Sequence, residues 1–371
     1  MKKDKVLFTG PLPPPYMGPT FATEVILNST LADEFDLVHF DTSDHRPLES
    51  LGAFDFVNVW LGIKSYFVML YLLLRHWPRL VYIPISQTTL GYLRDMPYIL
   101  LSWMLGRTTV CHLRGGNFRN WYDNASSLTR WMVRRVHRRL DGQIVLGECL
   151  KPLFHDIIPE DRIYVCWNGK DVELAPAKDN DDETIRVLFF ANLIRTKGVI
   201  DALEGFRTAS QSNDRMELVL AGTWNEPDVK EEIEAELRQH PDLRVKCIGP
   251  VIGDQKYELF SMADIFVFPT YYPPEGHPWV VVEAMANSLP IISTNHAAIP
   301  DSVVDGENGF LVDKRATDKI AERLVQLADD SVLRERMSKR SRELYLEGFT
   351  EQKMVDQMTL VFHQLLENPS K

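Results

Sequence analysis

The chain has 371 residues, 45% of them hydrophobic and 25% charged, which excludes fibrous and intrinsically disordered proteins. At about 100 to 200 residues per domain, this length predicts two domains with separate cores. The 41 basic and 52 acidic residues give a net charge of -11, which argues against nucleic acid as a partner.

The first residues, MKKDKVLFTG, lead directly into a short apolar run and lack the longer apolar core of a signal peptide. The most apolar stretch, residues 65–74, is about half as long as the ~20 residues that a membrane-spanning helix needs. The cysteines are far apart and form no C-x-x-C pair, so we expect reduced core thiols in a cytoplasmic protein. They are Cys111, Cys149, Cys166 and Cys247.

Short β-branched or apolar runs alternate with longer helix-like segments, which predicts an α/β protein with β–α–β units and parallel sheets. The alternation restarts after residue 183, so we expect two Rossmann-like halves. Candidate strands of the first half are 6–10, 54–60, 79–84, 108–115, 142–147 and 163–169. Candidate strands of the second half are 185–192, 216–222, 243–249, 265–270 and 290–294.

A polar, acidic linker is predicted between the halves at residues 174–184. Residues 1–170 carry 19 basic and 16 acidic side chains, so +3, which leaves 22 and 36, so -14, for residues 171–371. The D-x-D string at residues 179–181 matches the short pattern of metal-dependent sugar transferases, but a solvated linker explains the same residues. We therefore predict no metal site.

The predicted domains are residues 1–173 and 185–350. Residues 351–368 repeat apolar side chains near helical spacing, which predicts a terminal amphipathic helix. The periodicity does not decide which domain this helix joins, and our domain assignment places it with the first.

The segment 270–292 follows a predicted strand and places Glu275 on a loop and Glu283 on a helix. Pro278 is predicted at the first helical position, which its fixed φ suits. The amides of the first turn, with the positive end of the helix dipole, can bind an anion. Carboxylates and amides together fit a hydroxyl-rich, phosphorylated ligand. The alternative is an ordinary helix on which Glu283 is solvated and Glu275 is a turn residue.

The string from Glu275-Gly276-His277-Pro278 to Glu283-Ala284-Met285-Ala286 resembles the Glu-x7-Glu signature of retaining GT-B glycosyltransferases, especially family 4. The resemblance continues, in the same order and spacing, through LVLAG (218–222), ADIFVFPT (263–270) and DGENGFLVD (305–313). The first half matches more loosely, at residues 11–23, 112–118, 144–151 and 167–172.

The resemblance implies two Rossmann-like domains facing each other across a cleft, with the acceptor in the first domain and a nucleotide sugar in the second. It implies that Glu275 contacts the donor sugar and that Glu283 binds the ribose hydroxyls. The residues after the first glutamate would offer amides to the sugar and the diphosphate; they are Gly276, His277, Pro278, Trp279 and Val280. Backbone near Gly249, Pro250 and Val251 would hold the base.

The family's phosphate loop, G-R-L-x-x-x-K-G, is written here as residues 191–198, Ala-Asn-Leu-Ile-Arg-Thr-Lys-Gly. Lys197 matches the family lysine, and Asn192 stands where the arginine is usual. A diphosphate leaving group needs positive charge as its bond to the sugar breaks. Arg195 supplies a second cation if the loop turns it inward, and otherwise it is a surface arginine.

In the first domain, Gly18 matches the glycine-rich loop that approaches the diphosphate in relatives. Relatives also carry a histidine at the end of the strand 108–115, near the sugar or the acceptor. That position is His112, or Arg114 has replaced it, and side chains two apart on a strand point to the same face. We favour Arg114, with His112 as a core or supporting residue.

The resemblance implies transfer with retention of anomeric configuration, without an essential metal or a cofactor beyond the nucleotide-diphosphate sugar that serves as donor. Positioning and electrostatic stabilisation would do the chemistry, with Glu275 positioning the sugar and not acting as a nucleophile. The expected acceptor is a saccharide or polyprenyl-linked saccharide of bacterial surface polysaccharide biosynthesis. The alternatives are a nucleotide-sugar epimerase or hydrolase on the same fold, or a non-catalytic nucleotide-sugar-binding subunit.

Residues 126–139 predict a basic amphipathic helix, which can lie on anionic lipid. Its arginines are Arg130, Arg134, Arg135, Arg138 and Arg139. An exposed helix with solvated arginines explains the same pattern. Because the region 60–105 of the same domain is unusually apolar, we expect peripheral association with the inner face of the plasma membrane.

Overall fold

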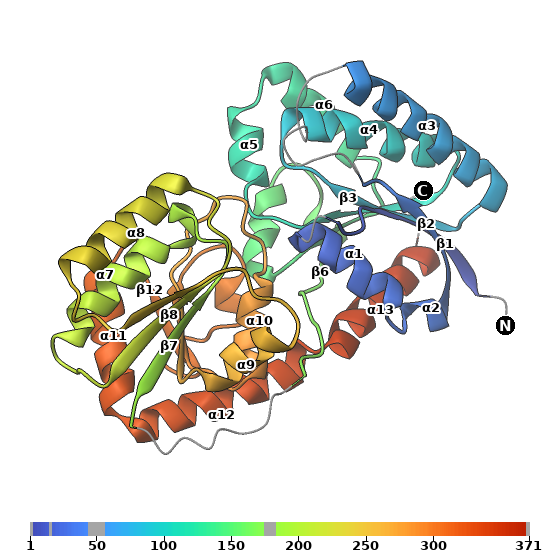
Figure 1. Ribbon diagram of the computed structural model, residues 1–371. Helices are drawn as coiled ribbons and strands as arrows, with labels where there is room; N and C mark the ends of the chain where they lie inside the picture. The colour runs from blue at the N-terminus through green and yellow to red at the C-terminus, as the bar shows by residue number, and fades with distance from the viewer. Residues whose placement is uncertain (1–2, 15–16, 44–55, 174–182, 369–371) are drawn as a thin grey trace. The chain divides into compact units, whose positions relative to one another are not determined.

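The computed structural model describes residues 3–14, 17–43, 56–173 and 183–368. Its internal contacts divide the chain into two units, unit 1 from residues 1–170 and 351–371, and unit 2 from residues 171–350. Each unit is built on a six-stranded sheet whose neighbouring strands all run parallel (Figure 1). Residues 174–182, which hold most of the predicted linker and its D-x-D string, lie outside the described residues.

The sheet of unit 1 has the strand order β2-β1-β3-β4-β5-β6. The strands are β1 (Asp4–Gly10), β2 (Phe35–Asp41), β3 (Leu80–Ile85), β4 (Thr108–Leu113), β5 (Gly142–Val145) and β6 (Ile163–Val165). The chain order reverses between β1 and β3, which pair from Val6 with Leu80 to Phe8 with Tyr82. Open α/β sheets bind ligands at the carboxyl ends of the strands beside such a reversal.

Helices cover both faces of this sheet. Because β–α–β crossovers are right-handed, the helices that follow β2, β3 and β4 lie on one face, where α3 packs on α4 and α4 on α6 (Figure 1). This layer is α3 (Phe56–His76), α4 (Thr89–Met104), α5 (Phe118–Asn124) and α6 (Ser127–His137). The other face carries α1 (Gly18–Asn28), α2 (Leu31–Glu34) and α13 (Glu351–Glu367). Two short 3₁₀ segments, η2 (Glu148–Phe154) and η3 (Glu160–Arg162), precede β6.

The terminal helix α13 confirms the amphipathic helix predicted over residues 351–368. It packs on unit 1, where the buried Phe362 ring lies 5.5 Å from Phe35 and 6.1 Å from Tyr82, measured between ring centroids. Burying a phenylalanine contributes about 1.5–3 kcal/mol. This contact fixes the last segment of the chain to the sheet that begins it.

One predicted strand is wrong. Residues 56–60 of the predicted strand 54–60 form the start of α3, a helix of 21 residues. The alternation of apolar and polar residues in FDFVNVW is typical of a strand, but this segment belongs to a longer apolar run. The length of such a run distinguishes helices from strands better than a few alternating residues do. The sequence analysis also missed β2, whose polar residues alternate with apolar ones, and β12.

Unit 2 has the strand order β12-β11-β10-β7-β8-β9. The strands are β7 (Ile185–Phe190), β8 (Met216–Ala221), β9 (Val245–Ile248), β10 (Ile265–Phe268), β11 (Ile291–Thr294) and β12 (Gly309–Val312). The helices are α7 (Val199–Ser210), α8 (Pro227–Gln239), α9 (Asp254–Met262), α10 (Trp279–Ala286), α11 (Thr317–Asp329) and α12 (Ser331–Gly348), with 3₁₀ segments η4 (Arg195–Lys197) and η5 (Ile299–Asp301). Here the order reverses between β7 and β10, so a ligand site is expected at the carboxyl ends of these two strands.

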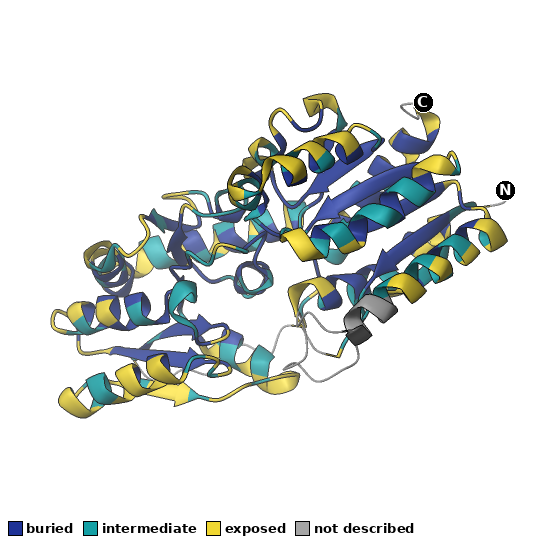
Figure 2. Ribbon diagram, turned by 90° about the horizontal axis from the view of Figure 1, so that it is seen from above, coloured by how far each residue is buried: buried dark blue, intermediate teal, exposed yellow. Residues whose placement is uncertain are grey.

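The strands of both sheets are mostly buried, and exposed residues lie on the outer faces of the helices (Figure 2). The four cysteines are free thiols: Cys111 and Cys166 are buried as expected, whereas Cys149 and Cys247 are exposed, so the prediction of core thiols holds for two. Within the described residues, no helix has both the length and the apolar character needed to cross a membrane.

Candidate active site

Two loops at the carboxyl ends of β7 and β10 bring Lys197 and Glu275 together. The Lys197 Nζ donates to Glu275 Oε2 at 2.5 Å. Glu275 is only 9% exposed, and the Lys197 ammonium also lies 4.7 Å from the centroid of the Tyr272 ring. The site is therefore a nearly buried ion pair at the point where the strand order reverses.

Backbone contacts between the two loops hold this pair in place. The amide of Tyr271 donates to the carbonyl of Thr196 at 2.8 Å. Gly198, next to Lys197, has φ +82, and a Cβ there would lie 2.4 Å from the carbonyl oxygen of Pro269. Only glycine fits a left-handed position with backbone so close. Gly198 thus lets the lysine loop approach the glutamate loop.

The second glutamate of the motif is also paired with a lysine. Glu283, on α10, is 2% exposed, and its Oε1 accepts a hydrogen bond from Lys256 Nζ at 2.6 Å. Lys256 lies in the first turn of α9, and its ammonium is 5.0 Å from the centroid of the Phe190 ring at the end of β7. Sequence reasoning missed Lys256, because no local pattern connects it to a glutamate 27 residues further along.

The helix α10 begins one residue later than predicted, at Trp279, with Pro278 as its N-cap. Proline suits either of these two positions at the start of a helix, because it has no amide hydrogen that would be left without a partner. The first amides of a helix have no partner within it, and here they belong to Trp279 and Val280. His277 is buried with its ring 5.3 Å from the Phe349 ring, and the carbonyl of Gly276 accepts from the Ala298 amide.

Arg195 does not join the Lys197–Glu275 pair. Its guanidinium bonds to Glu232 at 2.5 Å and lies 3.6 Å from Asp228, both on α8. The hydrogen bond to Glu232 raises the pKa of Arg195. Of the two alternatives from the sequence, the structure matches the surface arginine. Asn192 is exposed in the turn that follows β7 and brings no charge to the loop.

The predicted base-binding segment Gly249, Pro250 and Val251 follows β9 and leads into α9. It is largely exposed, and a Cβ on Gly249 would meet no heavy atom within 4 Å. In the part of the chain that the structure describes, no three His, Cys, Asp or Glu side chains come together as metal ligands.

In unit 1, His112 and Arg114 belong to one hydrogen-bonded network at the end of β4. The Tyr82 hydroxyl lies 2.8 Å from His112 Nδ1, and Arg114 Nη2 donates to the same hydroxyl at 2.9 Å. Burial, reinforced by the Arg114 charge, holds the pKa of His112 well below its usual range. His112 is therefore a neutral supporting residue in the core.

Arg114, in contrast, lines a cavity of about 430 Å³ at the carboxyl ends of β1, β3 and β4. The buried Asp95 and its partner Arg94, both on α4, also line it. Sequence reasoning missed this pair, although adjacent charges inside an apolar helix were a usable signal. Gly18 is the first residue of α1, next to the lining residue Met17, and a Cβ there would meet open space.

Comparison with known proteins gives these sites a context. Residues 172–344 match the family model of glycosyl transferases group 1. The capsular polysaccharide biosynthesis glycosyltransferase CapM of Staphylococcus aureus is 27% identical over 180 residues, which are 48% of this chain and 46% of CapM. The match therefore spans about half the length of that curated relative.

Two solved structures share the whole fold. The sucrose-phosphate synthase of Thermosynechococcus elongatus has a TM-score of 0.74 at 16% identity, covering 98% of this chain and 100% of that chain. HepE of Anabaena, solved with UDP, has a TM-score of 0.74 at 18% identity, covering 97% and 100%. These likenesses and the two parallel sheets show the GT-B fold, and the match to glycosyl transferases group 1, at residues 172–344, lies within unit 2.

Proposed function

We propose that the protein is a retaining glycosyltransferase that moves a sugar from a nucleotide-diphosphate sugar to a saccharide acceptor in bacterial polysaccharide biosynthesis. The observation that carries the proposal is the Lys197–Glu275 pair at the carboxyl ends of β7 and β10, with Glu283 close by on α10. The glycosyl transferases group 1 match, the name of CapM and the HepE complex with UDP-glucose support this class of reaction and donor.

In this proposal both carboxylates serve ligand hydroxyls. Glu275 accepts a hydrogen bond from a hydroxyl of the donor sugar, and Glu283 accepts from the ribose. Both carboxylates are ionic partners of lysines, so ligand hydroxyls approach acceptors whose charge is balanced. The base lies near Gly249 to Val251, where the backbone is exposed.

Lys197 is the group that does most for the chemical step. When the bond between the sugar and the diphosphate breaks, negative charge grows on the departing oxygen. An ammonium placed against that oxygen stabilises the transition state more than the ground state, which raises the rate. The acceptor hydroxyl oxygen bonds to the anomeric carbon on the side that the diphosphate leaves, and its proton passes to the departing diphosphate, so the configuration is retained without a metal. The cavity in unit 1 favours transfer to a second substrate over hydrolysis or epimerisation.

We further propose that the acceptor is carried on a lipid and that unit 1 binds the inner face of the plasma membrane. The helices α3 and α6 contain no Asp or Glu, and the one carboxylate of α4, Asp95, is buried. On α6, Arg134 and Arg135 are exposed near Trp131, and Arg138, the residue that follows the helix, is exposed as well. A basic and apolar layer of this kind matches an anionic lipid surface.

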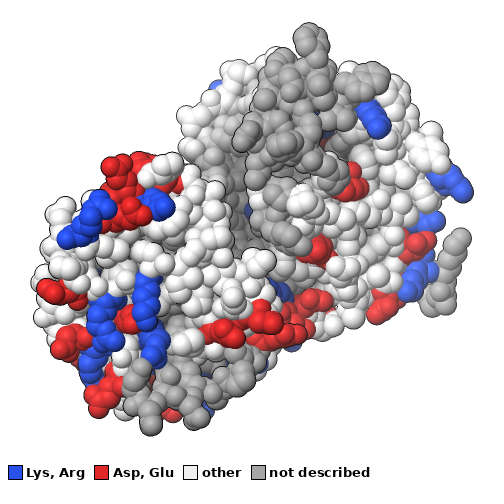
Figure 3. Space-filling view, viewed as in Figure 1, with Lys and Arg blue, Asp and Glu red and all other residues white. Residues whose placement is uncertain are grey.

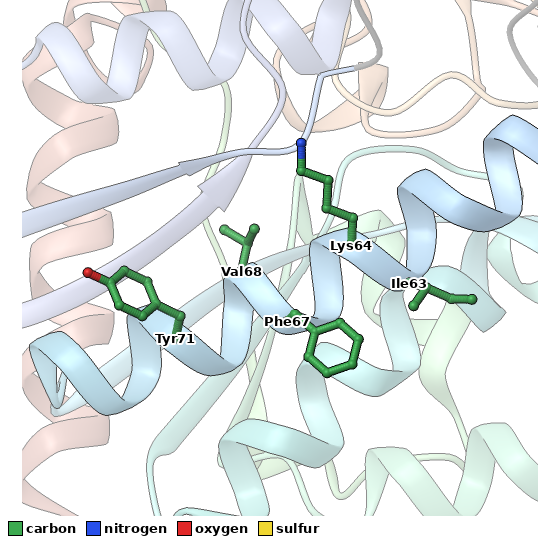
Figure 4. A pocket seen from close by; sticks show the side chains of 5 residues that line it. All are labelled: Ile63, Lys64, Phe67, Val68 and Tyr71. Carbon is green, nitrogen blue, oxygen red and sulfur yellow. The ribbon is translucent and has the colours of Figure 1, made fainter.

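An apolar stripe on α3 adds to this layer. Ile63, Phe67, Tyr71 and Leu74 follow each other at helical spacing and are 42%, 69%, 62% and 54% exposed. The first three line a shallow apolar hollow beside Lys64 (Figure 4). In the view of Figure 3, Lys and Arg as well as Asp and Glu side chains gather on unit 2.

A thermal-shift panel of UDP-, GDP- and ADP-glucose, with and without EDTA, tests the donor site. A ligand that binds only the native state raises the melting temperature, so one nucleotide class should raise it and EDTA should not matter. Product anomers identified by NMR test retention. A panel without any shift would contradict the donor site, and a shift abolished by EDTA would contradict metal independence.

A further inference from the structure

The cavity of unit 1 has the position of a substrate site. It lies beside the reversal between β1 and β3, where the strand ends and the loops that follow them form its wall. Its volume of about 430 Å³ is that of a small-ligand pocket. The wall mixes apolar side chains such as Leu12 and Met17 with hydroxyls such as Ser43 and Thr88.

One of the two arginines in this wall is already neutralised. Arg94 Nε donates to Asp95 Oδ1 at 2.9 Å, and the other oxygen of Asp95 accepts from the Ser86 amide at 2.8 Å. Asp95 is 2% exposed, so this pair is part of the built wall. It brings no net charge to the cavity.

Among the residues that the structure describes, the second arginine has no acidic partner. Arg114 bonds to two neutral oxygens, the Tyr82 hydroxyl and Asn168 Oδ1, the latter at 3.4 Å. None of the ion pairs among described residues includes Arg114. Two nitrogens of its network, Arg114 Nε and His112 Nε2, are buried without a hydrogen-bond partner in the described part of the chain.

The charged residues in the described wall are therefore two arginines and one aspartate, a net charge of +1. A partly buried cation without a counter-ion is unfavourable by itself, and an anionic ligand relieves that cost. The planar guanidinium matches a carboxylate or a phosphate, which it can bind through two parallel hydrogen bonds. The neutral, hydroxyl-bearing remainder of the wall suits a polyol.

We propose that this cavity binds the acceptor through an anionic group, so that the acceptor is a hydroxylated molecule carrying a carboxylate or a phosphate held by Arg114. The proposal rests on the proposed transferase function, because it names the acceptor class of that reaction. The donor's diphosphate is also an anion that Arg114 could bind, so the experiment must distinguish the acceptor from the donor.

Saturation-transfer NMR on the full chain tests the cavity with glucuronate, which differs from glucose by its carboxylate. We expect saturation of glucuronate, little of glucose, and displacement of glucuronate by inorganic phosphate. Arg114→Gln should weaken glucuronate binding at least tenfold. The control Arg119→Gln removes an equal charge from a surface pair with Asp123 and should leave binding unchanged.

Saturating UDP separates the two sources. If glucuronate still binds with UDP present, the anion site belongs to the acceptor; if UDP displaces it, the site belongs to the donor and the proposal is overturned. Equal binding by Arg114→Gln, or no binding of either anion by the natural protein, also overturns it. Arg114→Lys is the second variant, for use if Arg114→Gln fails to fold. It keeps the positive charge but loses the planar guanidinium, so it should bind glucuronate with intermediate affinity. UDP binding followed by fluorescence reports separately on the transferase function.

Discussion

The two units differ in how the charged side chains at the carboxyl ends of their strands are paired. In unit 2 both carboxylates of the proposed donor site pair with a lysine, Glu275 with Lys197 and Glu283 with Lys256. Among the described residues of unit 1, the hydrogen bonds of the Arg114 guanidinium go to neutral oxygens. A carboxylate whose charge is balanced by a lysine can accept hydrogen bonds from ligand hydroxyls, whereas a cation without an acidic partner favours an anionic ligand. Two sheets of the same architecture therefore carry sites that differ in charge, paired in unit 2 and positive in unit 1.

The largest expected effect is on the unit 2 pair. Lys197→Ala should lower kcat by about 10²–10³-fold, because it removes charge stabilisation of the leaving diphosphate. Arg195→Ala is the matched control and should cost less than about threefold, since Arg195 is exposed and pairs with Glu232 on α8. Initial rates with saturating donor measure both. The reverse order would mean that Arg195 and not Lys197 serves the phosphate.

Acid should weaken unit 1 more than unit 2. Burial lowers the pKa of His137 to about 4 from 6.5, so the folded protein holds this imidazole neutral. As the pH falls, His137 binds a proton in the unfolded chain before it does so in the folded protein. The stability that is present above pH 6.5 is therefore lost between pH 6.5 and pH 4. The loss amounts to about 3 kcal/mol at 1.36 kcal/mol per pKa unit.

Hydrogen exchange at pH 7 and pH 5 measures this difference, with peptides of β4 and α6 compared with peptides of β7 and β10. Exchange of the unit 1 peptides should accelerate at pH 5 after correction for intrinsic rates. His137→Gln should reduce the pH dependence, although it lowers stability at pH 7, and the remainder belongs to His112, whose pKa burial also lowers. An unchanged pH dependence would show that His137 does not cause the effect.

The two glutamates of unit 2 should separate binding from chemistry. Glu283→Gln should weaken nucleotide affinity by about 10- to 100-fold, the cost of a charge-assisted hydrogen bond to the ribose. Glu275→Gln should keep nucleotide affinity within about threefold and lower kcat, since it acts on the sugar. Calorimetric titration with UDP and rates with the donor sugar distinguish them. Full activity in both variants would remove the basis of the site.

The loop that carries Lys197 can be tested through its glycine. Gly198→Ala places a methyl group against the Pro269 carbonyl at a positive φ and should destabilise the protein by about 1–3 kcal/mol. Gly18→Ala is the control in unit 1, where the added carbon meets open space. Denaturant unfolding measures both. An unchanged midpoint for Gly198→Ala would show that the loop relaxes without loss.

The sequence predicted what local pattern and the family motif determine. Most strands, the terminal helix, and the loop and helix positions of Glu275 and Glu283 follow from periodicity and spacing. Residues 56–60 were assigned to a strand because a few alternating residues resemble a strand at the start of a helix. Lys256 and the cavity around Arg114 could not be found, since both depend on segments that only the tertiary fold brings together.

The smallest expected effect per residue is on the outer layer of unit 1. Each arginine near an anionic membrane contributes about 1 kcal/mol, so Arg135→Gln with Arg138→Gln should lower affinity for vesicles containing phosphatidylglycerol by roughly 30-fold. Phe67→Ser should lower it further and should also act on neutral vesicles, because it removes apolar contact. The control Arg336→Gln with Lys339→Gln removes equal charge from α12 of unit 2. Equal binding of both charge variants in a vesicle sedimentation assay would show that the arginines of α6 are only solvated.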